Sequence, residues 1–205
     1  MLLALWLLLL AQDPPPVDVG AHFETTVTES RFGTTAVIPS GLRGEIYYLK
    51  PGTQSLPKFE KLKPVGVIYA KGLNLPPRDF TEGFPGVTDR LEWFAIDYTG
   101  RFYVTKPGRY RFALLSDDGS KLYIDGHPVI KNDGIHGTVR VDGSVTLAAG
   151  IHNIRLSYFQ GPRFSISLIL GVLRPGDKDW RVFNTDEFKP PVNPDDWVGN
   201  KRPPS

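Results

Sequence analysis

Residues 108–127 read GRYRFALLSDDGSKLYIDGH, and this stretch carries the clearest indication of the fold. Apolar side chains alternate with other side chains at Tyr110, Phe112 and Leu114, and the same alternation returns over residues 122–124. A period of two is typical of a strand that buries one face. The Asp-Gly pair at 125–126 tolerates the positive φ angles of a two-residue hairpin, so we predict a tight hairpin there.

The same pattern continues on both sides of this stretch. Alternating apolar runs occur at Phe102/Val104, Val139/Val141, Val145/Leu147, Ile154/Leu156/Tyr158 and Phe164/Ile166/Leu168/Leu170. Turn-forming pairs such as Pro107-Gly108, Asp133-Gly134 and Asp142-Gly143 separate them, roughly one every eight to eleven residues. This rhythm predicts an all-β fold, an antiparallel β-sandwich.

The composition excludes several classes of function. The chain has 205 residues, 40% of them hydrophobic, which suits one domain with a real core. Its 24 basic and 22 acidic residues nearly cancel, so the strong positive field of a nucleic-acid binder is missing. The chain has no cysteine, which excludes disulfides, thiolate metal sites and cysteine nucleophiles.

The two ends of the chain differ from its middle. Residues 1–11, MLLALWLLLLA, form an apolar run too short for a stable membrane anchor, and we predict a signal peptide and a secreted, cell-envelope or periplasmic protein. No Lys or Arg precedes this run, and a buried N-terminal helix is the alternative. We expect a leader at 12–40, the sandwich at 41–188 and a proline-rich tail at 189–205.

Seven short motifs follow one another in a recognisable order. They are WF at 93–94, GRFYV at 100–104, GRYRF at 108–112, SDDGS at 116–120, YIDG at 123–126, NDGIHG at 132–137 and YFQG at 158–161. From Gly41 to about Phe188 this order resembles the PA14 domain family, named for the N-terminal part of anthrax protective antigen. The segment 84–98 and NDGIHG are also similar to the related fibro-slime domains. The resemblance implies a β-sandwich found in bacterial glycosidases, toxins and yeast flocculins, and often used to bind glycans.

Asp117 and Asp118 are the first candidate site. In a regular strand their carboxylates would point to opposite faces, so one cation could contact both only if the backbone between them is distorted, for example by a cis peptide. The resemblance implies that the paired aspartates hold Ca²⁺, which in turn binds vicinal hydroxyls of a sugar. The alternative is an Asp-Asp-Gly turn whose carboxylates accept backbone N–H bonds and bind no ion. Both interpretations remain open at this point.

Calcium takes about six to eight oxygen ligands, so two aspartates cannot complete the shell. The resemblance implies a further Asn or Asp from the loop after Tyr158-Phe159, but residues 160–163 are Gln-Gly-Pro-Arg, with no acidic side chain. Gln160 could offer its carbonyl, and the 132–137 stretch offers further oxygens and the nitrogen of His136, although Asn-Asp-Gly is first a turn former. The predicted ligand-binding residues are therefore Asp117, Asp118, Asn132, Asp133, Gln160 and Arg163, with Asp117 and Asp118 as metal ligands.

A sugar-binding module also needs a flat side chain on which the apolar face of a sugar ring can stack. We expect Trp93, Tyr158 and Trp180 in the core, because each lies in or beside a strand-like run. Trp197, in the proline-rich tail, is then the expected exposed aromatic residue.

These observations predict a secreted carbohydrate-binding module, with a glycan or polysaccharide as partner and Ca²⁺ as the candidate cofactor. The alternative is a metal-independent structural or adhesive surface module that binds a cell-surface or matrix protein. A glycoside hydrolase could draw a carboxylate pair from Asp89, Glu92, Asp117, Asp118 and Asp133, but nothing fixes their separation. No nucleophile elbow, phosphate loop or His-Glu-x-x-His helix occurs, so we predict no enzymatic activity.

Overall fold

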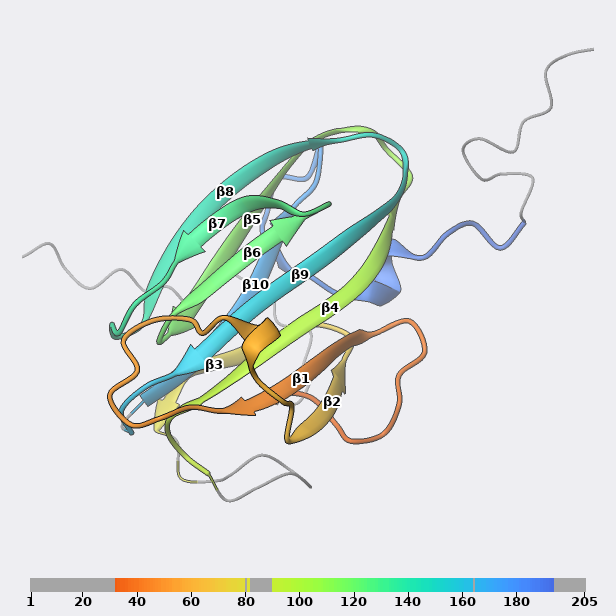
Figure 1. The fold of residues 1–205 in the computed structure, drawn as a ribbon. Coiled ribbons are helices and arrows are strands. Elements are labelled where there is room, and N and C mark those ends of the chain that lie inside the picture. Colours follow the sequence, from red (N-terminus) through yellow and green to blue (C-terminus); the bar gives the residue numbers. More distant parts are fainter. Residues whose placement is uncertain (1–31, 80, 82–89, 164, 194–205) are drawn as a thin grey trace, which may run out of the picture.

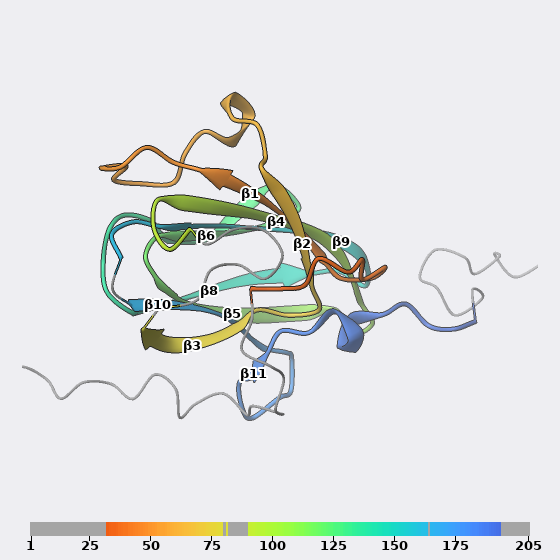
Figure 2. The same ribbon diagram turned by 90° about the horizontal axis from the view of Figure 1, so that it is seen from below.

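The computed structural model describes residues 32–79, 81, 90–163 and 165–193. Two antiparallel sheets pack face to face (Figures 1 and 2). The first has the order β2-β1-β4-β9-β6-β7 and comprises β1 (Leu42–Tyr48), β2 (Gly66–Ala70), β4 (Phe94–Val104), β6 (Ser120–Ile124), β7 (His127–Asn132) and β9 (Gly150–Gln160).

The second sheet has the order β11-β10-β5-β8, and β3 also pairs with β10. Its strands are β3 (Asn74–Asp79), β5 (Gly108–Asp117), β8 (Val139–Leu147), β10 (Ser165–Leu173) and β11 (Arg181–Val182). Two short 3-10 helices, η1 (Phe59–Lys61) and η2 (Thr185–Phe188), lie in the connections. The predicted antiparallel β-sandwich is confirmed.

The alternating apolar residues form the core between the sheets. Phe112 and Leu114 of β5 are buried against Leu156 and Tyr158 of β9, and none of these four side chains is exposed to solvent. Each large apolar side chain buried in this way contributes about 1.5–3 kcal/mol. The period of two in the sequence therefore arises because every second side chain of these strands is buried between the two sheets.

The predicted hairpin at residues 124–127 is confirmed. Ile124 pairs with His127, which leaves a two-residue loop between β6 and β7. The loop residues Asp125 and Gly126 have φ angles of 50° and 78°. Both angles are positive, as a type I′ turn requires.

The folded unit includes part of the predicted leader. Phe32 is 4% exposed and belongs to the main core, and Thr34 exchanges two backbone hydrogen bonds of 2.8 and 2.7 Å with Tyr69. At the other end the last helix, η2, closes with the buried Phe188. The predicted signal peptide and Trp197 lie outside the described residues. No helix in the described part of the chain is long and apolar enough to cross a membrane.

One end of the sandwich gathers several strand ends and their connections. β5 leaves the second sheet at Asp117, and β6 enters the first sheet at Ser120, so residues 117–119 link the two sheets. The register places the end of β7 and the start of β8 beside this link, because Asn132 pairs with Ser120 and Val139 with Ser116. The connection from β9 to β10 is residues 161–164, and its described part, residues 161–163, lies at the same end.

Candidate functional site

Asp117 and Asp118 lie where β5 turns into β6, and the peptide bond between them is cis. Oδ2 of Asp117 accepts a hydrogen bond of 2.6 Å from the hydroxyl of Ser165. Asp118 accepts one backbone N–H on each carboxylate oxygen, from His136 at 3.0 Å and from Gly161 at 2.8 Å. Asp118 therefore joins the 133–138 loop to the 161–164 loop.

Both carboxyl groups are buried, with 5% exposure for Asp117 and 3% for Asp118. Burial raises the pKa of Asp117, and the hydrogen bond from Ser165 only partly offsets it. Burial likewise raises the pKa of Asp118, against the opposing effect of the Gly161 and His136 amides. No Lys or Arg within the described ranges forms an ion pair with either carboxylate. Two buried carboxyl groups without such an ion pair favour either protonation or a bound cation.

Gly119, the third residue of the motif, is required by close packing. A Cβ at this position would lie 2.3 Å from Cε1 of Phe159 and 2.9 Å from the backbone nitrogen of Gly134. No larger residue fits between β9 and the 133–138 loop without displacing one of them. The Asp-Asp-Gly sequence thus places two carboxylates and one close backbone contact in three consecutive residues.

Asn132 secures this turn from the interior of the sandwich. Its side-chain amide donates to the hydroxyl of Ser116 at 3.1 Å and to the main-chain oxygen of Val139 at 3.2 Å. The hydroxyls of Ser116 and Ser120 lie 2.6 Å apart. Asn132 is 7% exposed, and these bonds hold the ends of β5, β6 and β8 together.

Asp133 was predicted to join the two aspartates, and the structure does not bring it to them. Its Oδ1 accepts the backbone N–H of Leu56 at 2.8 Å, and its Oδ2 forms an ion pair of 2.7 Å with Lys121. Both oxygens of this carboxylate are therefore bonded within the protein, one to the β1–β2 connection and one to β6. Its role is to tie the 133–138 loop to the first sheet.

Gln160 likewise does not offer its carbonyl to a ligand. It is 1% exposed, and its Oε1 accepts a bond of 2.5 Å from the hydroxyl of Tyr158. Its Nε2 donates to the main-chain oxygens of Pro162 and Ser165 at 3.2 and 3.1 Å. The amide is thus used to shape the 161–164 loop, where the resemblance implied an oxygen ligand.

The exposed side chains at this end belong to the two loops that Asp118 joins. Arg163 is exposed, and its backbone N–H donates to Oε2 of Glu92 at 3.0 Å. Ile135 is 40% exposed and lies beside Gly161. The ring of His136 contacts the main-chain oxygens of Gly137 and Asn132 at 2.7 and 3.1 Å, and its backbone N–H donates to Asp118.

The two aspartates fit a hard cation in chemistry, because they supply anionic oxygens that no Lys or Arg of the described residues pairs with. Among the described residues, no three His, Cys, Asp or Glu side chains form a group that could hold a metal ion. A calcium ion here would need further oxygens from the main chain of the loops, from water or from the ligand itself.

The aromatic predictions are partly wrong. Tyr158 lies in the core as expected. Trp93 is only partly buried and packs in a second cluster, with Phe59 and Phe159, on the outer side of the first sheet. Trp180 is also partly buried, on the outer side of the second sheet, with Arg140 at 4.8 Å from its ring centroid. In both places a connection covers the outer face of a sheet, a pattern that alternation alone does not reveal.

Sequence reasoning also missed Ser165, which holds Asp117, and Ser116 and Ser120, which flank the paired aspartates in the SDDGS motif. The two serines that border the motif were a signal, since hydroxyls beside a tight turn commonly hydrogen-bond within it. Nothing in the sequence points to Ser165.

Comparison with known proteins relates the described architecture to a known domain. The profile of the PA14 domain matches residues 74–180. The PA14 domain of the MpAFP antifreeze protein is 21% identical, with a TM-score of 0.61 over 74% of this chain and 93% of that one.

Two further solved structures are similar. A PA14 sugar-binding domain from an RTX adhesin is 20% identical, with a TM-score of 0.59 over 72% of this chain and 96% of that one. The epithelial adhesin 9 A domain from Candida glabrata, in complex with Galβ1-3GlcNAc, is 13% identical, with a TM-score of 0.54 over 78% of this chain and 95% of that one. A comparison with curated proteins found no match. At these identities the likeness concerns the fold.

Proposed function

The chain belongs to the PA14 domain family, and from this premise we propose that it is a carbohydrate-binding module whose site is built on Asp117 and Asp118. The observation that carries the proposal is the pair of buried carboxylates at the end of the sandwich, without a Lys or Arg partner in the described part of the chain. Two similar structures support it, one described as sugar-binding and one as bound to Galβ1-3GlcNAc.

Calcium is the proposed cofactor, held by Asp117 and Asp118. When bound, the ion would supply coordination positions for vicinal hydroxyls of a sugar. The chain's own residues prepare the site. Ser165 orients the carboxylate of Asp117, and Asp118 fixes the two neighbouring loops through the backbone N–H groups of His136 and Gly161.

The loops offer side chains that could contact the sugar beyond the ion. Ile135 presents an exposed apolar surface on one loop, and Arg163 presents a guanidinium on the other. Apolar C–H faces of sugars pack on such surfaces, and guanidinium groups donate to hydroxyls or acid groups. The 133–138 and 161–164 loops would therefore set the specificity of the module.

A metal-independent adhesive or structural module is the second candidate. The hydrogen bonds of Asp118 to two backbone N–H groups favour it, because a carboxylate in that role stabilises loops without any ion.

We propose binding and no catalysis in either case, and the similar structures named above are described as adhesin and antifreeze-protein domains. We also propose export, which mass spectrometry of the secreted protein would test by locating the mature N-terminus.

A glycan array probed with calcium and with chelator tests the proposal. Asp117→Asn should weaken glycan retention at least tenfold, on the order of 1.4 kcal/mol, because a neutral amide is a poor ligand for a hard cation. Asp133→Asn is the matched control, because the carboxylate of Asp133 is bound to Lys121 and not to the site. It should retain the glycan.

The outcomes separate the alternatives. Glycan retention that is equal in parent and Asp117→Asn, and indifferent to chelator, would contradict the calcium site and favour the adhesive module. Turnover of an oligosaccharide would contradict the proposal of a non-enzymatic module. Melting temperatures of both variants control for loss of fold.

A further inference from the structure

The outer face of the second sheet carries a row of arginines. Because Phe112 and Leu114 of β5 point into the core, Arg109 and Arg111 point outward, and both are exposed. They are two residues apart on one strand, about 6.6 Å. The neighbouring strand β8 adds Arg140 and the hydroxyl of Ser144 on the same side.

The charges in this row are not balanced. Asp142 forms ion pairs with Arg140 at 2.8 Å and with Arg111 at 3.6 Å. The guanidinium of Arg109 donates to the hydroxyl of Ser144 at 3.0 and 3.3 Å, and no carboxylate of the described residues pairs with it. Arg109 therefore has no acidic partner among the described residues, whereas Arg111 and Arg140 both reach the carboxylate of Asp142.

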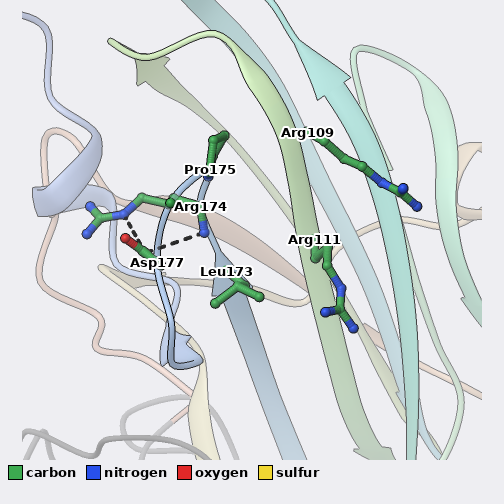
Figure 3. A pocket seen from close by; sticks show the side chains of 7 residues that line it. Arg109, Arg111, Leu173, Arg174, Pro175 and Asp177 are labelled. Carbon is green, nitrogen blue, oxygen red and sulfur yellow. Dashed lines mark hydrogen bonds and ion pairs between the residues drawn. The ribbon is translucent and has the colours of Figure 1, made fainter.

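The row borders a hollow of about 480 Å³ beside the turn that follows β10. Its lining consists of Arg109, Arg111, Leu173, Arg174, Pro175, Gly176 and Asp177. Figure 3 shows Arg109 and Arg111 extending from β5 in the same direction, whereas the guanidinium of Arg174 points away from them. Arg174 is bound to Asp177 at 3.0 Å and to Glu187 at 3.3 Å, so its charge is compensated within the protein.

Lys106 extends the positive surface to the other side of this turn. A second hollow of about 340 Å³ shares residues 174–177 with the first and adds Lys106 and Tyr110. The ammonium of Lys106 lies 3.2 Å from the position that a Cβ of Gly176 would take, and it forms no ion pair with the described carboxylates. Uncompensated cations thus lie on both sides of the 174–177 turn.

Trp180 holds two of the arginines in place. Its ring packs over Ala113, Leu115 and Ile169, and the guanidinium carbons of Arg111 and Arg140 lie 5.2 and 4.8 Å from its centroid. Stacked guanidinium groups lose less conformational freedom when they bind a ligand than mobile ones do. The row is therefore preorganised for anionic groups.

We propose that this face is a second binding site, and that its ligand is an acidic polysaccharide recognised through carboxylate or sulfate groups. Guanidinium groups donate two parallel hydrogen bonds to such groups. Ser144 offers a hydroxyl, and Leu173 and Pro175 offer apolar contact to the sugar rings. Single-stranded nucleic acid fits less well, because it needs open aromatic platforms for its bases and the ring of Trp180 is engaged by two arginines.

This site is distinct from the paired aspartates. Asp117 lies six positions after Arg111 on β5, about 20 Å along the strand. Binding here uses no metal, so it should be insensitive to chelator. The salt dependence should instead be steep, because each neutralised charge releases counterions.

The test uses the full protein with an acidic carboxylated polymer (polygalacturonate), a sulfated polymer (dextran sulfate), neutral dextran and single-stranded DNA. The double variant Arg109→Gln/Arg111→Gln should weaken retention of the acidic polymer at least tenfold and should reduce its salt dependence. The control Arg101→Gln/Lys131→Gln removes the same charge from exposed positions of the first sheet and should change retention less than twofold. The carboxylated and sulfated arms identify which acid group is recognised.

Several results would overturn the site. If the double variant and the control lose acidic-polymer retention equally, the binding is general charge attraction and not a site. If DNA is retained more strongly than both acidic polymers, the face binds nucleic acid. Loss of acidic-polymer binding in Asp117→Asn would place it at the proposed calcium site instead. If the double variant does not fold, Arg109→Gln alone applies the same test, because its guanidinium contacts only Ser144 Oγ among the described partners.

Discussion

The hydroxyl of Tyr158 donates a hydrogen bond of 2.6 Å to the main-chain oxygen of Asp117, and so joins β9 of the first sheet to the end of β5 in the second. The same hydroxyl lies 2.5 Å from Oε1 of Gln160. All three residues are buried. The position of the paired aspartates therefore depends on a core tyrosine that no ligand would touch.

We expect Tyr158→Phe to lower the free energy of unfolding by about 1–3 kcal/mol, because it removes the one hydroxyl proton that the buried main-chain oxygen of Asp117 and Oε1 of Gln160 share. It should also reduce calcium and glycan binding, since Asp117 loses a support. Urea unfolding and calorimetry measure the two effects. Tyr110→Phe is the matched control, because its buried hydroxyl donates at 2.9 Å to the main-chain oxygen of Lys106, at the end of β5 opposite to Asp117. It should cost similar stability and leave binding intact; equal binding losses would contradict the link.

Gly119→Ala should destabilise the protein by about 1–3 kcal/mol or more, because the added methyl would overlap Phe159 and the backbone of Gly134. Thermal unfolding measures this directly. Gly126→Ala is an informative comparison, because nothing lies within 4 Å of its Cβ position and its cost comes from its φ angle of 78° alone. If Gly119→Ala were as stable as the parent, the close approach of β9 to the motif would be wrong.

Asp118→Ala should loosen the two loops that the carboxylate joins. The amides of His136 and Gly161 lose their acceptor, and an unpaired buried N–H costs about 1–3 kcal/mol. Hydrogen exchange should accelerate at these two amides first. The amide of Leu56, which donates to Asp133, serves as the internal control and should keep its protection. Unchanged exchange at His136 and Gly161 would show that other contacts hold the loops.

Local patterns of the sequence predicted the sandwich because a strand that buries one face has an apolar side chain at every second residue. The hairpin at 124–127 followed from Asp-Gly for the same reason, since two adjacent residues set its φ angles. The position of Asp117 and Asp118 at a turn between sheets was also visible in the sequence, beside the resemblance to the family.

The pairings within the site were not predictable from local patterns. Asp133 meets the backbone of Leu56, 77 residues away, and Lys121, and Gln160 turns back onto Tyr158. A side chain whose oxygen lies in the expected loop can thus have all its hydrogen bonds within the protein, and only its structural partners reveal that it does not face a ligand. The arginine row on the outer face of the second sheet was not predicted for a related reason. In the sequence, Arg109 and Arg111 are simply the polar residues that alternate with apolar ones along a strand.

The last prediction concerns the stability of the protein in the absence of calcium. The pKa of Asp117 is raised by burial, so the folded state favours its protonated form. This contribution to stability is fully present below the unfolded pKa of about 3.9 and is lost as the pH rises through the raised folded pKa. Above the folded pKa and without calcium, the ionised carboxylate of Asp117 therefore weakens the fold.

Asp117→Asn should then be more stable than the parent at pH 7 in chelator, and this advantage should vanish in acid, where the parent is protonated. The hydroxyl of Ser165 can turn to accept from the new amide, so little bonding is lost. Calcium at about 100 times its Kd should add about 2.7 kcal/mol to the parent and nothing to the variant, which reverses the order. Melting curves across pH with calcium or chelator measure this, and Asp142→Asn, at an exposed carboxylate, is the control. A variant less stable than the parent at pH 7 in chelator, together with a parent indifferent to calcium, would assign the Asp117 carboxylate to structure alone.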